Sequence, residues 1–547
     1  MCCPAESVLR LLTMFHCLAQ HTMVKELRTQ TVDLRLHRVP KLRAEAWNLE
    51  HPQPFFPSLE QLFKTEKLAS MSEYGVKLPE EVESVVDADR IKTTKGQTLS
   101  VHRKTTMILS PFKTMKGEYS APGLPKPAET AKGYSEQMQS PHTAAYVGAL
   151  ASAVLSTSEC VHFPRVYGIY AAMATKHEVN ISDDYEDLCD RKWFVDNIGK
   201  TFELRLRGAG GDAFTHTRGQ RAAVQIGDDI ELDAEDVEVE RVDEPTAMGV
   251  VEEYEIPSES ESDDEESDDE DVFDIESCAC SDSTEEDGSV DSEEDDDAFA
   301  WATFSGVPVV TTVMEKCTGT FYDLLKTSDD PVRHTAWVAQ VVFALAYAQR
   351  TFGFVHNDLH GNNVMYVPTT EEFVSYRHHG LTYRVPTFGV LIKIIDFDRA
   401  AFSVRITGMK DNRFFMSSQF KDDEEAAGQY NIEPFYTNTH PRIPLNPSFD
   451  LARFASSMFW DMFPAGPKQE TTHPLFEMFK HWTTLPDGSS VIFRAKGDNH
   501  DRYHGFDLYK AIARNLKESA VPRKELLKFG QYVTTVPPGT TVLVIAD

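Results

Sequence analysis

The sequence predicts a mixed α+β fold with two lobes, a small strand-rich lobe followed by a larger helical lobe. Three observations support this prediction. Short apolar and β-branched runs characterise the chain before residue 316, amphipathic helical patterns follow it, and a long acidic segment interrupts the first lobe. At 547 residues the chain could hold about two to four domains and bury a sizeable core.

The acidity of the chain is confined to one segment. The formal net charge is −33, but residues 228–297 hold 35 acidic residues and a single base, Arg241. The other residues are almost neutral, with 53 bases and 52 acids. Serine residues stand among the acids, and aromatic residues are almost absent. Such a segment cannot bury enough apolar surface to offset its ordering entropy, so we expect a long disordered insertion. It would act as a solvating spacer or as a docking segment for basic proteins.

Cysteine usage and hydropathy exclude two classes of protein. The eight cysteines are scattered and form no paired C-x-x-C motifs, which indicates reduced thiols rather than a zinc site or a disulfide framework. No run of about 18 apolar residues is present, so we expect no membrane span. The first residues also lack the pattern of a secretion signal.

The predicted elements follow one another in a simple order. In the first lobe we expect a strand, a basic loop, a buried helix and a second strand at Thr98–Leu109, Ser110–Tyr119, Ala144–Leu155 and His162–Ala172. After the insertion we expect an apolar strand at Val307–Glu315, a turn with a short helix at Lys316–Leu325, and a long helix at Arg333–Arg350. The remaining expectations are a strand at Val364–Val367, a hairpin at Glu371–Val390, a loop at Ser403–Asn446, helices at Asn446–Phe459, Leu475–Trp482 and Phe506–Leu516, and an extended tail.

These elements divide the chain into six regions. They are an N-terminal extension at 1–95, the first part of the N-lobe at 96–226, the insertion at 227–300, the last N-lobe strand and hinge at 301–316, the C-lobe at 317–533 and a tail at 534–547.

Two stretches carry the chemistry. The first is F-V-H-N-D-L-H-G-N-N at Phe354–Asn363, and the second is I-K-I-I-D-F-D-R-A at Ile392–Ala400. Asp358 could accept the proton of an attacking hydroxyl, and Asn363, five residues on, could hold a metal ion. Asp396 ends an apolar run and could reach a metal that bridges phosphates. This is the H-R-D-x-x-x-x-N plus D-F-G layout of protein kinases.

Three positions depart from that layout. Asn357 replaces the arginine, His360 stands where lysine is usual, and Asp398 replaces the glycine. His360 could donate to a γ-phosphate only while protonated or in the right tautomer. Farther along, Asp450 in the first turn of a predicted helix could accept hydrogen bonds from the backbone of the first stretch.

The nucleotide site is expected at the hinge. The strand that ends in M-E leads into a glycine-containing turn, so the backbone of Glu315, Lys316 and Cys317 would pair with an adenine edge. The segment R-G-A-G-G-D at Arg207–Asp212 is not the phosphate loop. It follows the first long helix instead of preceding it, and it lacks the strand-then-helix context. We interpret it as a linker that opens the insertion.

The chain resembles the serine/threonine protein kinases of large nucleocytoplasmic DNA viruses over roughly residues 100 to 530, the insertion excepted. The stretches that carry the resemblance are S-P-F-K-T-M-K-G-E-Y (Ser110–Tyr119), A-A-Y-V (Ala144–Val147), H-F-P-R-V-Y-G (His162–Gly168), I-S-D-D-Y-E-D-L (Ile181–Leu188), V-M-E-K-C-T-G-T (Val313–Thr320), G-F-V-H-N-D-L-H-G-N-N-V-M-Y (Gly353–Tyr366), V-P-T-F-G-V-L-I-K-I-I-D-F-D-R-A (Val385–Ala400), A-G-Q-Y-N (Ala427–Asn431), N-P-S-F-D-L-A-R-F (Asn446–Phe454) and R-Y-H-G-F-D-L-Y-K-A-I-A-R (Arg502–Arg514).

The resemblance implies a bilobal protein-kinase-like fold that binds ATP and one or two Mg²⁺ ions, with Asp358 as catalytic residue and Asn363 and Asp396 as metal ligands. The family pattern places a lysine at the position of Ile108 and an acid at the position of Gly148. Those two departures would remove the Lys–Glu pair that positions the phosphates. Lys104 is out of register with that pattern, but we keep it as the candidate phosphate-binding cation.

We therefore expect a serine/threonine protein kinase. Two alternatives remain open, a pseudokinase scaffold that keeps the fold and a small-molecule phosphotransferase, because the D-L-H form of the loop also occurs in aminoglycoside-phosphotransferase-like kinases. The expected partner is a protein substrate, with basic proteins matching the acidic insertion, and neither membrane nor nucleic acid is expected. The resemblance places the protein in the cytoplasm or nucleus of a host cell, or in the virion.

Overall fold

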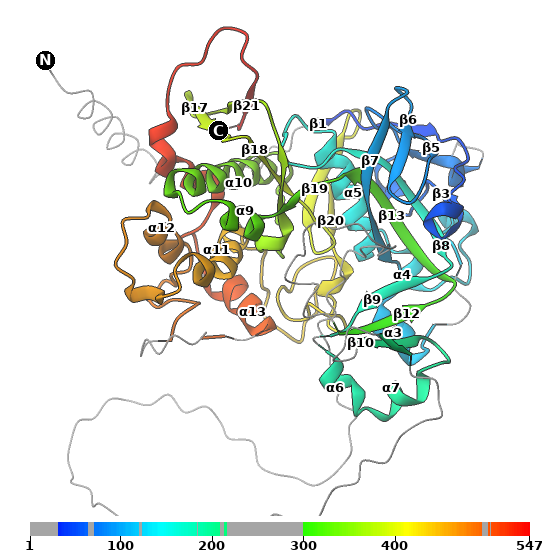
Figure 1. The fold of residues 1–547 in the computed structure, drawn as a ribbon. Coiled ribbons are helices and arrows are strands. Elements are labelled where there is room, and N and C mark those ends of the chain that lie inside the picture. Colours follow the sequence, from blue (N-terminus) through cyan, green and yellow to red (C-terminus); the bar gives the residue numbers. More distant parts are fainter. Residues whose placement is uncertain are drawn as a thin grey trace, which may run out of the picture. The chain divides into compact units, whose positions relative to one another are not determined.

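The fold is mixed α+β, as the sequence predicts (Figure 1). The computed structural model describes residues 31–63, 70–119, 123–182, 184–207, 213–215, 299–494, 502–503 and 505–546. The predicted acidic insertion at 227–300 lies outside the described residues except for its last two positions, and so does the linker after Arg207.

A six-stranded antiparallel sheet organises the first half of the molecule. Its strand order is β3 (Leu49–Gln53), β8 (Val166–Ala174), β13 (Val307–Glu315), β7 (Thr98–Met107), β6 (Arg90–Thr93) and β5 (Val82–Val85). β13 has the bounds that its apolar run predicts. It is buried almost throughout because both of its faces are packed, with Val310 and Met314 in one apolar cluster and Val307, Val309 and Val313 in another. Its register places Thr312 opposite Lys104 of β7.

The sheet begins earlier than the sequence suggested. β3, β5 and β6 all precede residue 96, where we placed the start of the N-lobe, and they pair with β8 and β7. The boundary at residue 95 is therefore wrong. β5 and β6 have four residues each, which is too short for a period-two pattern to stand out from the turns around them.

One helix covers this sheet. α5 (Ala144–Ser156) contacts β13 and β8 on the sheet and also β19 (Ala401–Ile406) and β20 (Arg413–Met416) (Figure 1). All its residues from Ala145 to Leu155 are buried, which explains why the segment consists of small apolar residues without a polar face. The predicted buried helix is confirmed.

A second, four-stranded sheet flanks the point where the insertion leaves the fold. Its order is β11 (Ala213–Thr215), β10 (Glu203–Arg207), β12 (Ala300–Phe304) and β9 (His177–Asn180). The backbone N–H of Arg207 donates to the carbonyl of Phe299 at 2.7 Å. The chain thus returns beside the place where it departs. Short helices near it are α3 (Pro111–Lys116), α6 (Tyr185–Cys189) and α7 (Lys192–Asn197).

Helices dominate the second half. They are α9 (Phe321–Thr327), α10 (Pro331–Phe352), α11 (Phe449–Met462), α12 (Pro474–Trp482), α13 (Phe506–Asn515) and α14 (Pro522–Glu525). α10 is the long predicted helix. Asp330 caps its start by accepting from the N–H of Val332, Pro331 occupies its first turn, and Gly353 ends it in a left-handed conformation. The predicted helices around α11, α12 and α13 are confirmed.

Several small sheets join distant segments. They combine β14 (Gly319–Thr320), β15 (Val364–Pro368) and β18 (Val390–Ile394); β17 (Leu381–Pro386), β16 (Phe373–His378) and β21 (Val542–Val544); β1 (Thr31–Val32), β19 and β20; and β2 (Leu36–Arg38) with β4 (Tyr74–Val76). One expectation needs correction. The region 403–446 is not only a loop, since β19 and β20 form a hairpin there. The tail, expected to be extended, contributes the strand β21 to a sheet. Further short helices are α2 (Ser58–Leu62) and α4 (Glu136–Gln139).

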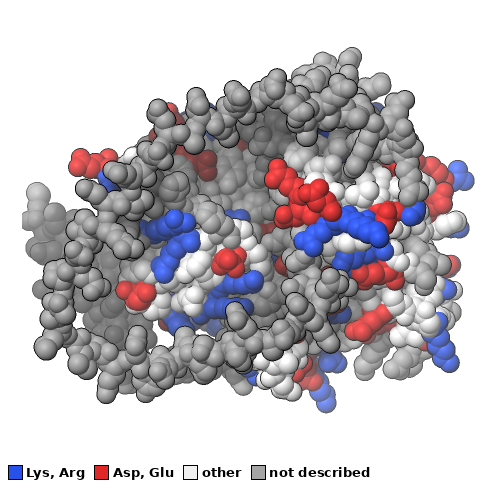
Figure 2. Space-filling view, turned by 90° about the horizontal axis from the view of Figure 1, so that it is seen from below, with Lys and Arg blue, Asp and Glu red and all other residues white. Residues whose placement is uncertain are grey.

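Opposite charges lie side by side on the described surface. On the face shown in Figure 2, Lys and Arg side chains stand next to Asp and Glu side chains. Lys113, for example, pairs with Asp423 at 2.6 Å and with Glu424 at 2.9 Å. Within the described ranges, no helix has both the length and the apolar character needed to cross a membrane.

Candidate functional site

The loop that follows α10 is fixed by a buried carboxylate. The backbone N–H groups of His356 and Asn357 donate to the two carboxylate oxygens of Asp450, each at 3.0 Å. Asp450 lies in the first turn of α11 and is fully buried, and this burial raises its pKa. The predicted contact between Asp450 and the loop backbone is confirmed.

Asn357 occupies a backbone conformation that suits its side chain. Its φ of 67° lies in the left-handed region, which asparagine tolerates better than most residues. The side-chain amide donates to the carbonyl of Arg399 at 3.0 Å and its oxygen accepts from the hydroxyl of Tyr430 at 2.8 Å. The residue is fully buried, so it joins three segments of the chain instead of facing solvent.

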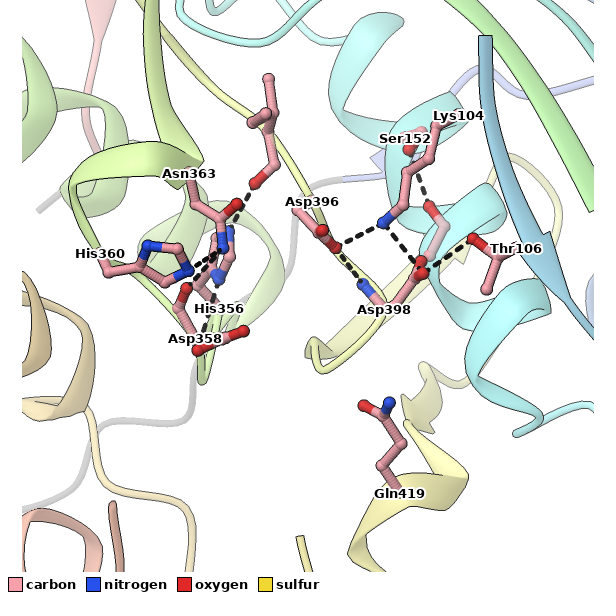
Figure 3. Close-up of polar contacts among 12 residues, drawn as sticks. Lys104, Thr106, Ser152, His356, Asp358, His360, Asn363, Asp396, Asp398 and Gln419 are labelled. Atoms are coloured by element: carbon pink, nitrogen blue, oxygen red, sulfur yellow. Dashed lines mark hydrogen bonds and ion pairs between the residues drawn. The ribbon is translucent and has the colours of Figure 1, made fainter. Parts of the chain in front are cut away.

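The two predicted metal ligands lie next to one another. β15 follows Asn363 and pairs with β18, which leads to Asp396, and the N–H of Ile395 donates to the carbonyl of Asn363 at 3.0 Å. The amide nitrogen of Asn363 donates to the carbonyl of Asp358 at 2.9 Å and lies 3.0 Å from Nε2 of His360 (Figure 3). Because both amide hydrogens are engaged, its oxygen remains to serve as a ligand.

This pair fits Mg²⁺ better than a metal that needs an all-protein cage. Carboxylate and amide oxygens are hard ligands, and Mg²⁺ is commonly held by one or two carboxylates together with substrate phosphates and waters. Among the described residues, no group of three or more His, Cys, Asp or Glu side chains could hold a metal on its own. Asn363 and Asp396 offer an amide oxygen and a carboxylate that could be two of the oxygen ligands of such an ion.

Asp358 lies in a positively charged and polar environment. Tyr509 of α13 donates its hydroxyl to Oδ1 of Asp358 at 2.6 Å. Burial alone would raise the pKa of Asp358, but the charge of Arg399, that of His360 in acid, the charge of Arg453 and the hydrogen bond from Tyr509 outweigh it and hold this pKa below its usual range. The carboxylate is therefore ionised at neutral pH and can accept a proton or a hydrogen bond. Neither arginine nor the tyrosine was predicted as a site residue.

His360 lies beside Asp358 but is not a cation at neutral pH. Burial lowers its pKa to about 4, although the nearby Asp358 acts in the opposite direction. Its Nε2 faces the amide nitrogen of Asn363 and therefore accepts. The suggested role as a protonated donor to a γ-phosphate does not match this environment, whereas the neutral tautomer with its hydrogen on Nδ1 keeps one N–H that could donate. The contact instead indicates that His360 orients Asn363.

Lys104 reaches the site from β7. Its ammonium pairs with Asp396, and with Oδ2 of Asp398 at 2.9 Å (Figure 3). Burial works against the charged form of Lys104, but the two carboxylates outweigh it and raise its pKa. No lysine stands at position 108 and no acid at position 148, so the expected pair between them is not formed, and the ion pair present is that of Lys104 with Asp396 and Asp398. Ile108 is buried in the core instead.

The two carboxylates beside Lys104 differ in their surroundings. Burial raises the pKa of both, but the close contact with Lys104 leaves that of Asp396 below its ordinary value. The pKa of Asp398 stays above its ordinary value, because burial and the nearby Asp396 exceed the effect of Lys104. Asp398 also accepts from the hydroxyl of Thr106 at 2.9 Å.

At the predicted hinge, Glu315 is bonded within the protein, whereas the backbone groups of the next two residues are not. The side chain of Glu315 pairs with Lys393 at 2.8 Å, and its N–H donates to the carbonyl of Arg165 at 2.8 Å. The backbone groups of Lys316 and Cys317 make no hydrogen bond to any described residue. They are therefore available to a ligand edge. Burial raises the pKa of the Cys317 thiol to about 12, so it stays protonated.

The turn between β5 and β6 is a feature that the sequence did not reveal. Residues 86–89 contain two carboxylates and no glycine. Indole Nε1 of Trp47 donates to the carbonyl of Asp87 at 3.1 Å, and Nε of Arg103 donates to the carbonyl of Ala88 at 3.0 Å. The only sequence signal for this turn is the pair of short strands on either side of it.

The comparisons with known proteins assign no family to the chain. No family model matches it. A curated Caenorhabditis elegans protein, described as uncharacterized, is 35% identical over 63 residues, which is 12% of this chain and 21% of that protein. The chain thus covers about a fifth of the relative it matches, and the match names no activity.

Proposed function

We propose that the protein is an ATP-dependent phosphotransferase with a bilobal protein-kinase-like fold, resembling the serine/threonine protein kinases of large nucleocytoplasmic DNA viruses. One observation supports this most strongly. Lys104 and Asp396 are 292 residues apart in the chain, yet they form an ion pair beside Asn363. If the two motifs were chance matches, there would be no reason for Lys104, the candidate metal ligands Asn363 and Asp396, and the ionised Asp358 to lie in one site.

The order of the elements supports the same proposal. β7 carries the cation, α5 follows as the first long helix, and β13 ends at the open backbone groups of Lys316 and Cys317. The loop with Asp358 and the strand end with Asp396 come next. This succession of lysine, helix, hinge, loop and metal-binding acid is the one that the sequence motifs imply.

The residues divide the work by their chemistry. Asp358 would orient the acceptor hydroxyl and take its proton, and it is ionised for that purpose. Asn363 and Asp396 would hold Mg²⁺, which neutralises phosphate charge when bound. Lys104 would contact the phosphates, and the backbone at Lys316 and Cys317 would bind the adenine edge. Most of the rate enhancement would come from positioning and electrostatics.

Phosphate transfer to different acceptor classes tests the proposal. The full-length protein is incubated with radiolabelled ATP and Mg²⁺, with casein and histone as protein acceptors and an aminoglycoside and choline as small acceptors. The proposal expects label on serine or threonine of a protein, with histone favoured if residues 228–297 dock basic substrates. Label on a small acceptor alone would identify a small-molecule phosphotransferase.

A second candidate is a pseudokinase scaffold. The carboxylates of Asp87 and Asp89 in the turn between β5 and β6 favour it, because a glycine-rich loop would offer bare backbone amides to phosphates there. Thermal unfolding with an ATP analogue, with and without Mg²⁺, separates the two. A Mg²⁺-dependent rise in Tm supports the enzyme, whereas no rise at millimolar nucleotide supports the scaffold.

A further inference from the structure

Two departures from the kinase pattern meet in space. Gly148 of α5 stands where an acid was expected, and Asp398 stands where a glycine was expected. A Cβ atom built on Gly148 would lie 3.0 Å from Cγ of Asp398 and would overlap its Oδ1 outright. The carboxylate therefore fills the space that any side chain at position 148 would enter.

We propose that Asp398 is the carboxylate that positions Lys104, in place of an acid on α5, and that residue 148 is glycine to admit it. The inference rests on the proposed function and names a positioning residue for it. The carboxylate beside Lys104 thus comes from the segment after β18 and not from α5.

The hydrogen bonds of Asp398 show that its position is specified. Lys104 and Thr106 lie two apart on β7, so both side chains point to the same face. Both contact Oδ2 of Asp398, each at 2.9 Å. If Asp396 were to ligate Mg²⁺, Lys104 would lose one partner but keep Asp398, which would hold its ammonium in place to contact phosphates.

Asp398 does not fit the alternative role of a metal ligand. One of its oxygens faces Lys104 and Thr106, and the other lies against Gly148. Figure 3 shows the carboxylate on the side of β7, away from Asn363. The residue is 5% exposed. It is also not among the described residues with a positive φ, so the backbone there does not require glycine.

Moving the acid back to the helix tests the inference. Four variants are compared with the wild type: Asp398→Asn, Asp398→Gly, Gly148→Glu, and Asp398→Gly combined with Gly148→Glu. Asp398→Asn and Asp398→Gly should each raise the KM for ATP by about tenfold or more, with a smaller change in kcat, because the cation loses its anchor. The combined variant should recover most of that loss, since the glutamate introduced on α5 restores a carboxylate near Lys104.

A matched pair outside the site provides the control. Asp423 pairs with Lys113 at 2.6 Å, and Asp423→Asn should leave the KM for ATP unchanged. If Asp398→Asn and Asp398→Gly keep the KM within about twofold of the wild type, or if the combined variant recovers nothing, the inference is overturned.

Thermal unfolding separates a failure of this inference from a failure of the proposed function. Gly148→Glu alone should lower Tm strongly, because its side chain meets Asp398, and adding Asp398→Gly should restore much of it. If the wild type transfers no phosphate and binds no ATP, the proposed function fails, but this coupling between positions 148 and 398 remains testable. Additive effects on Tm would contradict the packing on which the inference rests.

Discussion

Asp358 depends on neighbours that come from three parts of the chain. Arg399 lies in the segment after β18, Arg453 lies on α11, and Tyr509 on α13 donates the hydrogen bond. Arg453 and Tyr509 also contact each other, with the guanidinium of Arg453 over the Tyr509 ring, 4.9 Å from its centre. The ionised state of Asp358 is thus a property of the tertiary fold and not of the loop sequence.

Replacing Tyr509 with phenylalanine should shift the pH dependence of transfer. The variant loses a hydrogen bond to the charged form of Asp358, so the pKa of Asp358 rises. The acid limb of the kcat/KM profile should move to higher pH, while the rate at neutral pH falls by less than about tenfold. Tyr436→Phe is the control, because Tyr436 is 41% exposed. An unmoved acid limb would show that the hydroxyl does not tune Asp358.

Variants of Asp450 test how much its two backbone hydrogen bonds contribute to stability. In Asp450→Ala the N–H groups of His356 and Asn357 lose their acceptors in a buried place, so the free energy of unfolding should fall by about 2–5 kcal/mol. Asp450→Asn keeps one acceptor oxygen and should lose clearly less. Chemical denaturation of both variants measures the difference. Equal losses would mean that the two backbone hydrogen bonds contribute little.

Elements with a strong pattern could be predicted from the sequence. β13, α5 and α10 combine an apolar run with clear ends, and the structure places them where expected. β5, β6, β19 and β20 have four to six residues each and pair in local hairpins, so each run is too short for its period-two pattern to stand out from the turns around it. Sequence patterns carry little information about such pairs.

The candidate site was predictable to a similar degree. Asp358 and Asn363 lie in one short motif and Asp396 ends an apolar run in a second one, so local patterns suffice to nominate all three. The pairing of Lys104 with Asp398 could not be predicted by comparing the chain with the kinase pattern one position at a time. Taken singly, the residues at 108, 148 and 398 each look like the loss of a residue that a kinase needs. Only the packing of α5 against the strand end shows that the departures compensate one another.

The C-terminal strand β21 should contribute to stability. Ile545, next to β21, is 1% exposed, whereas Val544 within it is 48% exposed. Ile545→Ala should lower the free energy of unfolding by about 2–5 kcal/mol, because it leaves a cavity in the core. Val544→Ala should change it by less than about 0.5 kcal/mol. Similar small effects from both would show that the tail is not part of the cooperative fold.

For the whole molecule, the acidic segment should be dispensable for folding. The hydrogen bond between Arg207 and Phe299 brings together the two ends that flank it. Replacing residues 217–297 with a short Gly-Ser linker closes a much shorter loop, which costs little or even favours folding. Calorimetry should give one transition with Tm within a few degrees of the full chain. A large fall in Tm would contradict this prediction.

Magnesium-dependent transfer by metal-ligand variants is the most direct test of the central claim. Labelled phosphate transfer from ATP is followed for the wild type, Asp396→Asn and the control Asp423→Asn, with circular dichroism to check the fold. The account predicts Mg²⁺-dependent transfer by the wild type and the control. It predicts a loss of at least about a hundredfold in Asp396→Asn, because the ion loses its carboxylate ligand. Full activity of folded Asp396→Asn with an unchanged Mg²⁺ requirement would contradict the assignment of this site.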